Sequence, residues 1–530
     1  MKKIHLFLIA LISIQVYSQI QITSTIEYQG YDETQSYFGE GEYQIFLDNV
    51  DGVLDKPVII IDGFDPGDTR DIAALYGSLN FDGGNLADFL RDEGYDLVAL
   101  NAPQYTTDGK DIDGGADYIQ RNAMVLIELI NLINNQKIGN EELVIIGPSM
   151  GGLIARYGLT YMEQNAMNHE TRLFISFDSP HLGANIPISL QYLLNYFAKA
   201  QANADAQFVV DNVLNSPAAK EMLIDHYLAH LLNGSDYEQD PNLLLPNGAP
   251  NFRNVFQSEL NNLGFPQNVR NVAIINGSGA GTNIGFPGAL MVDTTLDLGA
   301  GITADVILHF TPFAGESINV TDFVGYFNGG QITDFSADSE SFNFTSGLDS
   351  SPGGMSRISS SLSGNTNPVI LALLEALEQD EYSFIPTLSS LAIDSESDWY
   401  AIPNSDNSPF DNSYIPSENE FHFTLTPQNV AFAISEILQE PLEISDNEFA
   451  TKYTLIKNPV GEQIRLKLNT AHSYTNVQLS IYNTSGQQLI SEKINNPSDE
   501  IAINHQLKTG IYFLNIKDSE TIYNVKIVVQ

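Results

Sequence analysis

A serine flanked by glycines is the residue of this 530-residue chain best suited to covalent chemistry. Ser149 lies in Gly147-Pro148-Ser149-Met150-Gly151, a Gly-x-Ser-x-Gly motif that follows the apolar run 143–146. A serine held on a tight turn between a strand and a helix exposes its hydroxyl for attack on an acyl carbonyl. A phosphate-binding loop is the competing interpretation, but no Lys follows the glycines as that loop requires. The motif therefore predicts that Ser149 is a nucleophile.

A serine nucleophile needs a base within reach, and the chain has nine histidines. His422 follows Ser149 in chain order and precedes a helix predicted at 427–438, with Thr at its N-cap and Pro at its first position. His226 and His230 have the i, i+4 spacing of zinc ligands on one helical face. The intervening Glu of a metalloprotease motif is absent, which favours a packing role for that pair. His422 is the predicted base.

Three carboxylates remain open as the residue that orients this base. Asp178 ends the predicted strand after the nucleophile and its helix, Asp394 follows the segment 384–391, and Asp411 lies in the segment 408–411. Acidic residues are numerous in this chain, so spacing alone does not choose among the three.

Acyl transfer also needs hydrogen-bond donors aimed at the developing oxyanion. The backbone N–H of Met150, directly after the nucleophile, is the first predicted donor. The Phe64 N–H, in the segment 61–66 after an earlier strand, is the second. Asp65 is close enough in sequence to oppose an anion at that place.

The elements that must position these residues alternate between strands and helices. Apolar, β-rich runs at 58–61, 97–100, 143–146 and 173–176 predict strands that are covered on both faces. Residues 119–133 place apolar side chains at helical spacing. Alternating units of this kind indicate an α/β fold with a parallel sheet.

Two stretches interrupt the alternation. Residues 185–265 are rich in Leu, Ala and Asn and predict an inserted helical cap, while residues 286–345 predict a β-rich insertion. The Ser/Gly-rich stretch 349–366 predicts a loop. The cap contains candidates for lining an apolar pocket: Leu190, Tyr192, Leu193 and Leu194.

Composition excludes several functions. The chain has 23 basic and 66 acidic side chains, a net charge of −43, so it would repel nucleic acid. It has no cysteine, which removes thiol nucleophiles, disulfides and cysteine metal sites. An acidic group also lacks the spacing of a calcium loop, so no metal or other cofactor is expected. Its members are Asp108, Asp111, Asp113 and Asp117.

Charge and sequence pattern divide the chain into segments. Residues 21–450 carry 13 basic and 60 acidic side chains, whereas residues 451–530 carry eight basic and six acidic ones. At the N-terminus, two lysines, an apolar run and small residues predict a signal peptide over 1–18. That run is shorter than the roughly 20 apolar residues of a membrane span. Short strands between Gly and Asn turns predict a small β-sandwich at the C-terminus.

Residues 57–438 resemble α/β-hydrolases of the lipase and PGAP1-like esterase group. The resemblance rests on the Ser149 motif, on Ser179-Pro180-His181-Leu182-Gly183 after the next strand, and on His422. Asp62 stands where such lipases usually have His before Gly. Tyr382 and Ser383 stand where the acid-bearing Asp-Gly precedes Thr-x-Ser.

The missing Asp-Gly pair affects the choice of the acid. Some lipases take it instead from the end of the strand after the nucleophile, so the resemblance favours Asp178 over Asp394 and Asp411. It implies a triad of Ser149, His422 and Asp178.

Residues 448–530 are similar to the type A C-terminal sorting domain of the type IX secretion system. Three blocks match in order: Asn458-Pro459, Ile481-Tyr482-Asn483-Thr484-Ser485-Gly486 and Leu507-Lys508-Thr509-Gly510-Ile511-Tyr512-Phe513-Leu514. The resemblance implies a Gram-negative, Bacteroidota-type cell and passage through the periplasm. Secretion or cell-surface attachment follows, with the type IX machinery as a partner.

The predicted protein is a secreted serine ester hydrolase that acts on lipid or other acyl esters. Its predicted segments are a signal peptide (1–18), a hydrolase domain (19–445) and a sorting domain (448–530). One alternative is a cell-surface binding protein on a hydrolase fold without catalysis, suggested by the missing Asp-Gly pair and the β-rich insertion. Another is a serine peptidase with the same triad.

Overall fold

The computed structural model describes residues 19–361, 368–438 and most of 452–529. Within the last range the residues outside the description are 458–459, 462, 470–473, 475, 484–487, 498, 509 and 519–521. The predicted signal peptide, residues 1–18, lies outside the described residues. The chain divides into two compact units, Met1–Ile437 and Leu438–Gln530, each of which is described by itself.

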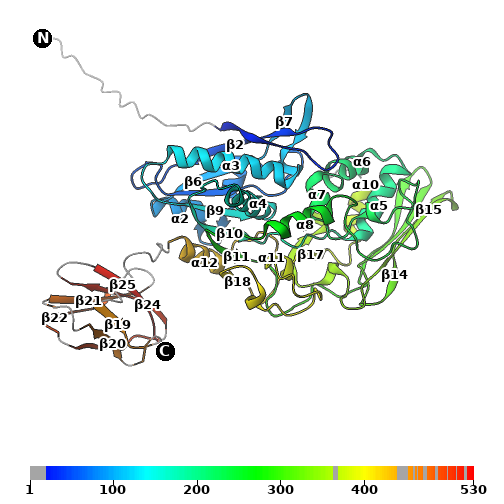
Figure 1. The fold of residues 1–530 in the computed structure, drawn as a ribbon. Coiled ribbons are helices and arrows are strands. Elements are labelled where there is room, and N and C mark those ends of the chain that lie inside the picture. The colour runs from blue at the N-terminus through cyan, green and yellow to red at the C-terminus, as the bar shows by residue number, and fades with distance from the viewer. Residues whose placement is uncertain are drawn as a thin grey trace, which may run out of the picture. The chain divides into compact units, whose positions relative to one another are not determined.

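An eight-stranded sheet forms the centre of the first unit (Figure 1), in the order β1-β2-β6-β3-β9-β10-β11-β18. Strand β2 runs antiparallel to β1 and β6, and the remaining neighbours are parallel. The strands are β1 Ile20–Tyr28, β2 Tyr37–Phe46, β3 Pro57–Ile61, β6 Asp96–Asn101, β9 Leu143–Pro148, β10 Thr171–Phe177, β11 Arg270–Ile274 and β18 Asn412–Tyr414. This arrangement confirms the predicted α/β-hydrolase fold.

Helices cover both faces of this sheet, which explains why its central strands are apolar throughout. Ile59 and Ile61 of β3 pack with α3 and α4, whereas Val58 and Ile60 pack with α1, α2 and α12 on the opposite face. The helices are α1 Ile72–Gly77, α2 Leu86–Asp92, α3 Ile119–Gln136, α4 Met150–Gln164 and α12 Pro427–Ile437. Thr426 caps α12 as predicted, because its Oγ1 accepts the Asn429 N–H at 3.2 Å.

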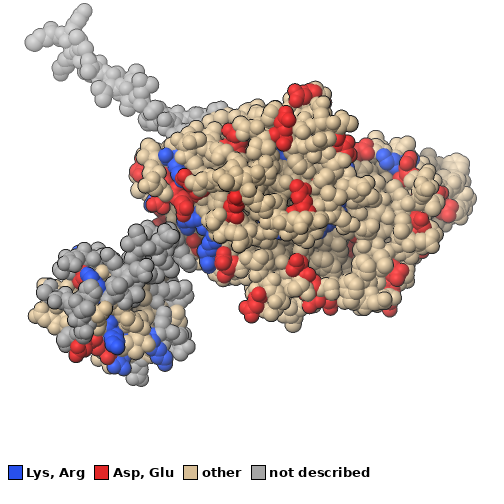
Figure 2. All heavy atoms as spheres, in the orientation of Figure 1, with Lys and Arg blue, Asp and Glu red and all other residues tan. Residues whose placement is uncertain are grey.

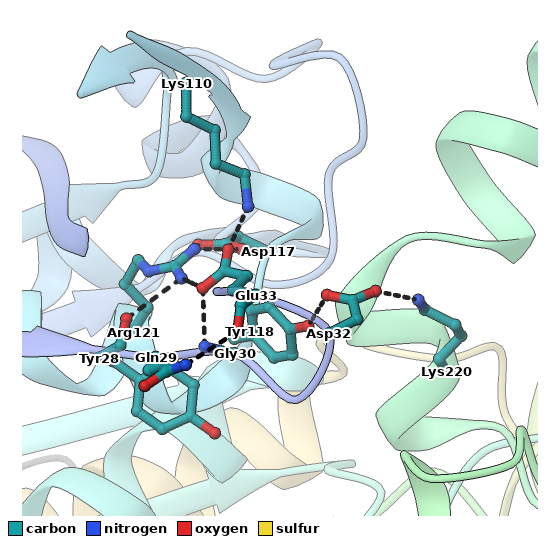
Figure 3. A network of polar contacts seen from close by, with 10 residues as sticks. All are labelled: Tyr28, Gln29, Gly30, Asp32, Glu33, Lys110, Asp117, Tyr118, Arg121 and Lys220. Carbon is teal, nitrogen blue, oxygen red and sulfur yellow. Dashed lines mark hydrogen bonds and ion pairs between the residues drawn. The ribbon is translucent and has the colours of Figure 1, made fainter. Parts of the chain in front are cut away.

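A partly buried group of charges fastens the connection between β1 and β2 to α3 and α7 (Figure 3). Arg121 of α3 pairs with Asp117 at 2.8 Å and also with Glu33. Asp32 pairs with Lys220 of α7 at 3.3 Å. Burial raises the pKa of Asp117 to about 6, although Arg121 opposes the shift. The role of Asp117 is therefore structural, as the ion-pair partner of Arg121.

The cap region after β10 is only partly helical. Its helices are α5 Ile188–Lys199, α6 Ala204–Val209, a π-helical turn Val210–Leu214, α7 Pro217–Met222, the 3-10 turn Tyr227–Ala229 and α8 Arg253–Leu263. Residues 230–252 contain no helix, so the predicted helical cap is helical only in part. Three prolines in that stretch, at 241, 246 and 250, explain the difference because proline interrupts helical hydrogen bonding.

An antiparallel four-stranded sheet, in the order β12-β13-β14-β15, follows the cap. Its strands are β12 Leu290–Gly299, β13 Ile302–His309, β14 Ser317–Phe327 and β15 Gly330–Glu340. Helix α5 packs against β13, β14 and β15, and α10 (Pro368–Glu375) packs against β12. Figure 1 shows these helices beside the sheet.

The stretch 349–366 was expected to be a loop, and this expectation was wrong for its middle. Strand β16 (Gly353–Arg357) pairs there with β17 (Glu381–Pro386) and leads into α9 (Ile358–Ser361). The remaining short elements are β4 Asn80–Phe81, β5 Gly84–Asn85, β7 Gln104–Thr107, β8 Lys110–Asp113, α11 Thr387–Ser390 and the 3-10 turns Gly114–Ala116, Leu348–Ser350 and Ser405–Asn407.

The second unit is a small β-sandwich with its own apolar core. Its two sheets have the orders β19-β20-β23 and β22-β21-β24-β25. The strands are β19 Tyr453–Leu455, β20 Gln463–Leu468, β21 Asn476–Asn483, β22 Gln488–Asn495, β23 Glu500–Asn504, β24 Gly510–Lys517 and β25 Ile522–Val529.

The surface of the first unit is acidic, with Asp and Glu side chains spread over the face visible in Figure 2 and few basic ones between them. Within the described residues, no helix combines the length and apolarity that a bilayer crossing requires.

Candidate active site

Ser149 occupies a strained turn between β9 and α4. Its φ of 52° and ψ of −128° lie in a region that side chains other than glycine rarely adopt. The Ser149 N–H donates to the Phe177 carbonyl of β10 at 2.8 Å, which ties the turn to the neighbouring strand. A Cβ on Gly147 would lie 2.6 Å from the Gly151 carbonyl oxygen, and one on Gly151 would lie 2.9 Å from the Ile61 oxygen. Both motif glycines are therefore required by close backbone approach.

The structure brings His422 and Asp178 together. The His422 Nδ1 and the Asp178 Oδ2 lie 2.7 Å apart, and the Asp178 side chain is fully buried. The other Asp178 oxygen accepts the Ser390 hydroxyl at 2.7 Å and the Asn276 N–H at 3.2 Å. With both oxygens bonded, the carboxylate is fixed and holds the imidazole in one orientation.

Asp178 lies beside the Ser149 turn because β9 and β10 are parallel neighbours. Their register pairs Pro148 with Phe177, the residues directly before Ser149 and Asp178. Neighbouring strands are about 4.8 Å apart, so the two turns emerge side by side at the carboxyl edge of the sheet. Within the described residues the Ser149 hydroxyl forms no hydrogen bond to His422.

Asp394 and Asp411, the other two carboxylates considered for this role, lie elsewhere. Asp394 is exposed and lines a separate pocket together with Arg156. Asp411 is exposed too, and its Oδ2 accepts the Asn271 N–H at 2.8 Å. Asn271 belongs to the start of β11, at the amino edge of the parallel strands and opposite the Ser149 turn. Asp178 is the one of the three that contacts His422.

Two further elements hold His422 in place. Its backbone N–H donates to the Met355 carbonyl of β16 at 2.8 Å. The Phe384 ring of β17 meets the imidazole edge to face, with ring centres 5.0 Å apart. Nearby, Glu420 accepts the Asn276 side-chain amide at 2.8 Å, and burial raises the pKa of Glu420. The β16–β17 pair thus helps to hold the histidine in place.

Gly354 of β16 is a site residue that sequence reasoning missed. A Cβ at this position would lie 2.0 Å from the Asp178 Oδ2, the atom that contacts His422. The carboxylate therefore occupies the space that a side chain at residue 354 would need. The consecutive glycines of Pro352-Gly353-Gly354 are compatible with a close approach, but they do not indicate which residue approaches.

The predicted oxyanion donors belong to segments next to Ser149. A Cβ on Gly63 would lie 3.1 Å from the Ser149 Cβ, so the loop after β3 runs past the nucleophile. Met150 is the first residue of α4, where backbone N–H groups have no helical acceptor. In the described part of the chain, neither the Phe64 nor the Met150 N–H donates to another group.

Arg70, also missed from the sequence, braces the loop that contains Phe64. Its guanidinium lies 3.0 Å from the Asp62 Oδ1 and donates to the Phe64 carbonyl at 2.9 Å. Burial raises the pKa of Asp62 and Arg70 opposes the shift, while the Asp62 Oδ2 has no hydrogen-bond partner among the described residues. Arg70 thus neutralises the acid that replaces the expected histidine.

The histidine pair of the cap does not lie on one helix but flanks the 3-10 turn Tyr227–Ala229. His226 Nδ1 accepts the Leu228 N–H at 3.2 Å, so its Nε2, 2.8 Å from the Leu214 carbonyl, is the donor. His230 Nε2 lies 2.7 Å from the Asp225 carboxylate, which raises the pKa of the histidine. Both rings are occupied by protein partners. Across the described residues, no three His, Cys, Asp or Glu side chains gather as a metal site.

Two regions of the chain match known protein families. Residues 106–209, which include Ser149 and Asp178, match the family described as "Putative serine esterase (DUF676)". Residues 457–530 match the family described as "Secretion system C-terminal sorting domain". No curated protein matches the chain.

Several solved esterase and lipase structures resemble parts of the chain at low identity. The lipase BlEst2 of Bacillus licheniformis in its propeptide form is 10% identical, with a TM-score of 0.29 over 92% of this chain and 96% of its own. Est1E of Butyrivibrio proteoclasticus is 9% identical, with a TM-score of 0.24 over 44% of this chain and 73% of its own. The esterase of Pyrobaculum calidifontis is 10% identical, with a TM-score of 0.25 over 49% and 67%.

The two family matches fall in different units of the chain. The first identifies the chain as a serine ester hydrolase, and the second identifies its C-terminal residues as a secretion sorting domain.

Proposed function

We propose that this protein is an exported esterase that cleaves acyl esters with a triad of Ser149, His422 and Asp178. The observation that carries the proposal is the 2.7 Å contact between the fully buried Asp178 carboxylate and His422, beside the strained Ser149 turn. A buried carboxylate on a histidine at the carboxyl edge of the sheet is the arrangement that activates a serine.

The reaction follows from the position of each group. The Ser149 Oγ attacks the ester carbonyl carbon while His422 Nε2 takes the hydroxyl proton, and Asp178 stabilises the resulting imidazolium. The tetrahedral intermediate collapses when His422 returns that proton to the leaving alcohol oxygen, which leaves an acyl group on Ser149. Water, deprotonated by His422, then attacks the acyl carbon, and the acid departs as Ser149 regains its proton.

The negative charge of each tetrahedral intermediate is received by backbone donors. The Phe64 and Met150 N–H groups take this role, and Met150 adds the favourable end of the α4 dipole. Asp62 would oppose this charge if it stood alone. Its ion pair with Arg70 removes most of that opposition and holds the Phe64 peptide in place.

The protein would carry out this activity after export from the cell's cytoplasm. The C-terminal sorting domain supports delivery by the type IX machinery to the cell surface or the medium. The predicted signal peptide at 1–18 would first take the chain into the periplasm. The partners in this proposal are an ester substrate and the secretion machinery.

Hydrolysis of p-nitrophenyl butyrate by a Ser149→Ala variant tests the proposed function. Loss of the nucleophile should reduce kcat by about 10⁴-fold or more, because the oxyanion donors alone retain little rate. Ser397→Ala, at an exposed serine, is the matched control and should keep full activity. An unchanged rate in Ser149→Ala would refute the proposal, and turnover confined to peptides would reassign the site to a peptidase.

A further inference from the structure

An apolar cavity lies between the cap and the four-stranded sheet. The cavity has a volume of about 190 Å³ and is partly open to solvent. Fourteen residues line it, from α5, α6, the connection between them, β12, β13, β14 and α10, and none is a proposed catalytic residue. Figure 1 shows α5, α6 and α10 beside strands β14 and β15 in the first unit.

One face of α5 forms a continuous wall of this cavity. Leu190, Leu193, Leu194 and Phe197 follow the i, i+3, i+4, i+7 pattern of a single helical face, and all four line the cavity. With a rise of 1.5 Å per residue, the wall is about 10 Å long. Leu190 and Leu193, which the sequence suggested as pocket residues, are part of it. Tyr192 is not, because its hydroxyl accepts a hydrogen bond from Gln239.

The opposite wall is formed by the strands and by α10. Leu296 of β12, Ala304 of β13 and Phe323 of β14 are almost fully buried and line the cavity, as does Leu373 of α10. Folded interiors contain few voids larger than a water molecule, because unfilled apolar space forfeits dispersion contacts. A hollow many times the size of one water molecule and lined mostly by apolar side chains can hold an apolar ligand.

The polar groups of the cavity lie where α5 passes into α6. Gln201, Asn203 and Asp205 line this part, and Gln201 and Asp205 are exposed. None of the described lining residues is basic, and the surrounding residues 21–450 carry 60 acidic against 13 basic side chains. An anionic headgroup would therefore meet the Asp205 carboxylate and no basic side chain among these lining residues.

We propose that this cavity binds the aliphatic chain of an uncharged lipid, with the chain along the α5 face and the polar end near Asn203 and Asp205. The length of the wall suits a medium-length chain, and the acidic rim disfavours fatty-acid anions. Two sources share this chemistry: the acyl chain of an ester that Ser149 cleaves, and a lipid that is held without being cleaved.

Direct binding to the Ser149→Ala variant of the full chain tests the cavity without turnover. Nile red fluorescence reports occupancy, and dodecanol and dodecanoate compete for the site. Leu298→Asp places a charge at the cavity on a side chain that is already 37% exposed, and it should weaken Nile red binding by about tenfold or more. Ile332→Asp, on the same sheet but outside the lining and 60% exposed, is the matched control and should bind as the parent does.

A filling variant gives a second test, because Ala206→Phe adds volume inside the cavity without adding charge. It should also weaken Nile red binding, and dodecanol should displace the dye at a concentration about tenfold below that of dodecanoate. Equal binding by Leu298→Asp, Ala206→Phe and Ile332→Asp would overturn the proposal. So would equal competition by the alcohol and the anion.

Hydrolysis by the active chain separates the two sources. If the chain belongs to the substrate, Leu298→Asp lowers the ratio of kcat/KM for p-nitrophenyl dodecanoate to that for the butyrate. If a separate lipid is held, the ratio stays constant while Nile red binding weakens. Failure of the proposed triad would appear instead as hydrolysis by Ser149→Ala, which leaves these binding measurements valid.

Discussion

The position of Asp178 depends on the absence of a side chain at residue 354. The carboxylate oxygen that contacts His422 fills the space where a Cβ on Gly354 would stand. This dependence makes Gly354 a positioning residue, since it touches neither the proposed nucleophile nor a substrate. It also connects the catalytic geometry to β16, a strand far from Ser149 in sequence.

Gly354→Ala should displace Asp178 and release His422 from its fixed orientation. We expect kcat for p-nitrophenyl butyrate to fall by about 10³- to 10⁴-fold with little change in KM, as when the orienting carboxylate of a triad is lost. Gly77→Ala, where an added Cβ would meet nothing within 4 Å, is the control. Equal kcat values for the two variants, with both folded by circular dichroism, would contradict this role for Gly354.

Arg70 should matter to the rate through the oxyanion loop. Arg70→Ala leaves Asp62 unpaired beside the Phe64 peptide, and we expect kcat to fall by about 10- to 100-fold. Adding Asp62→Asn to this variant removes the uncompensated charge and should restore part of the loss. Steady-state kinetics of the two single variants and the double variant measure the effect, and strictly additive losses would argue against the pairing.

At the scale of residues, the sequence supported some assignments better than others. Ser149 was identifiable because its turn needs glycines at fixed positions between a strand and a helix. The residues alone did not choose among three carboxylates, because many carboxylates fit the pattern of a turn residue, and only the family resemblance favoured Asp178. In the structure the register of β9 and β10 places Asp178 beside Ser149. Gly354 and Arg70 act through contacts between segments distant in sequence, which no local pattern records.

At the scale of elements, the cap responds to pH through a buried histidine. His226 is held neutral between Leu214 and Leu228, and burial lowers its pKa from 6.5 to about 4. The unfolded chain therefore binds a proton more readily than the folded one between these pH values. The stability that neutral His226 contributes is fully present above pH 6.5 and is lost as the pH falls toward 4, by up to about 3 kcal/mol.

Urea unfolding of the parent and of His226→Gln between pH 4 and 7.5 measures this contribution. Gln does not titrate, so the stability difference between the two proteins should shrink as the pH falls. Titration of all other groups is common to both and cancels in the comparison. A difference that stays constant over this range would show that His226 does not titrate in unfolding.

The elements differed in how well the sequence predicted them. The central strands are apolar on both faces because helices cover both, so the runs at 58–61 and 143–146 were clear. No strand was predicted over 20–46, where β1 and β2 bury residues in alternation on one side. Leu-rich composition suggested helix throughout the cap, yet the prolines between 230 and 252 prevent it.

At the scale of the whole molecule, acidic and basic side chains are unequally divided between the two units, each of which has its own apolar core. The residues proposed for catalysis all lie in the first unit, and the apolar cluster of the second unit contains residues of the second unit only. The charge contrast found in the sequence therefore follows a structural division. Counting charged residues was enough to find this division, because net charge follows from composition. A triad, in contrast, depends on three-dimensional contacts.

A chain of residues 19–445 should retain the activity of the longer protein. Every proposed catalytic and oxyanion residue lies within it, together with both apolar clusters that hold the central sheet. We expect the two proteins to agree within about twofold in kcat/KM for p-nitrophenyl butyrate. The shortened chain keeps every group that is proposed to contact the reacting atoms. A large loss of activity in a shortened chain that remains folded would assign the C-terminal unit a part in catalysis.

Covalent labelling tests the central claim most directly, because a fluorophosphonate reacts with an activated serine and spares unactivated ones. Peptide mapping of the labelled protein should place one adduct on Ser149, with labelling sharply reduced in His422→Ala and in Asp178→Asn. A protein that stays unlabelled, or an adduct on another serine, would contradict the triad and favour a binding protein on a hydrolase fold.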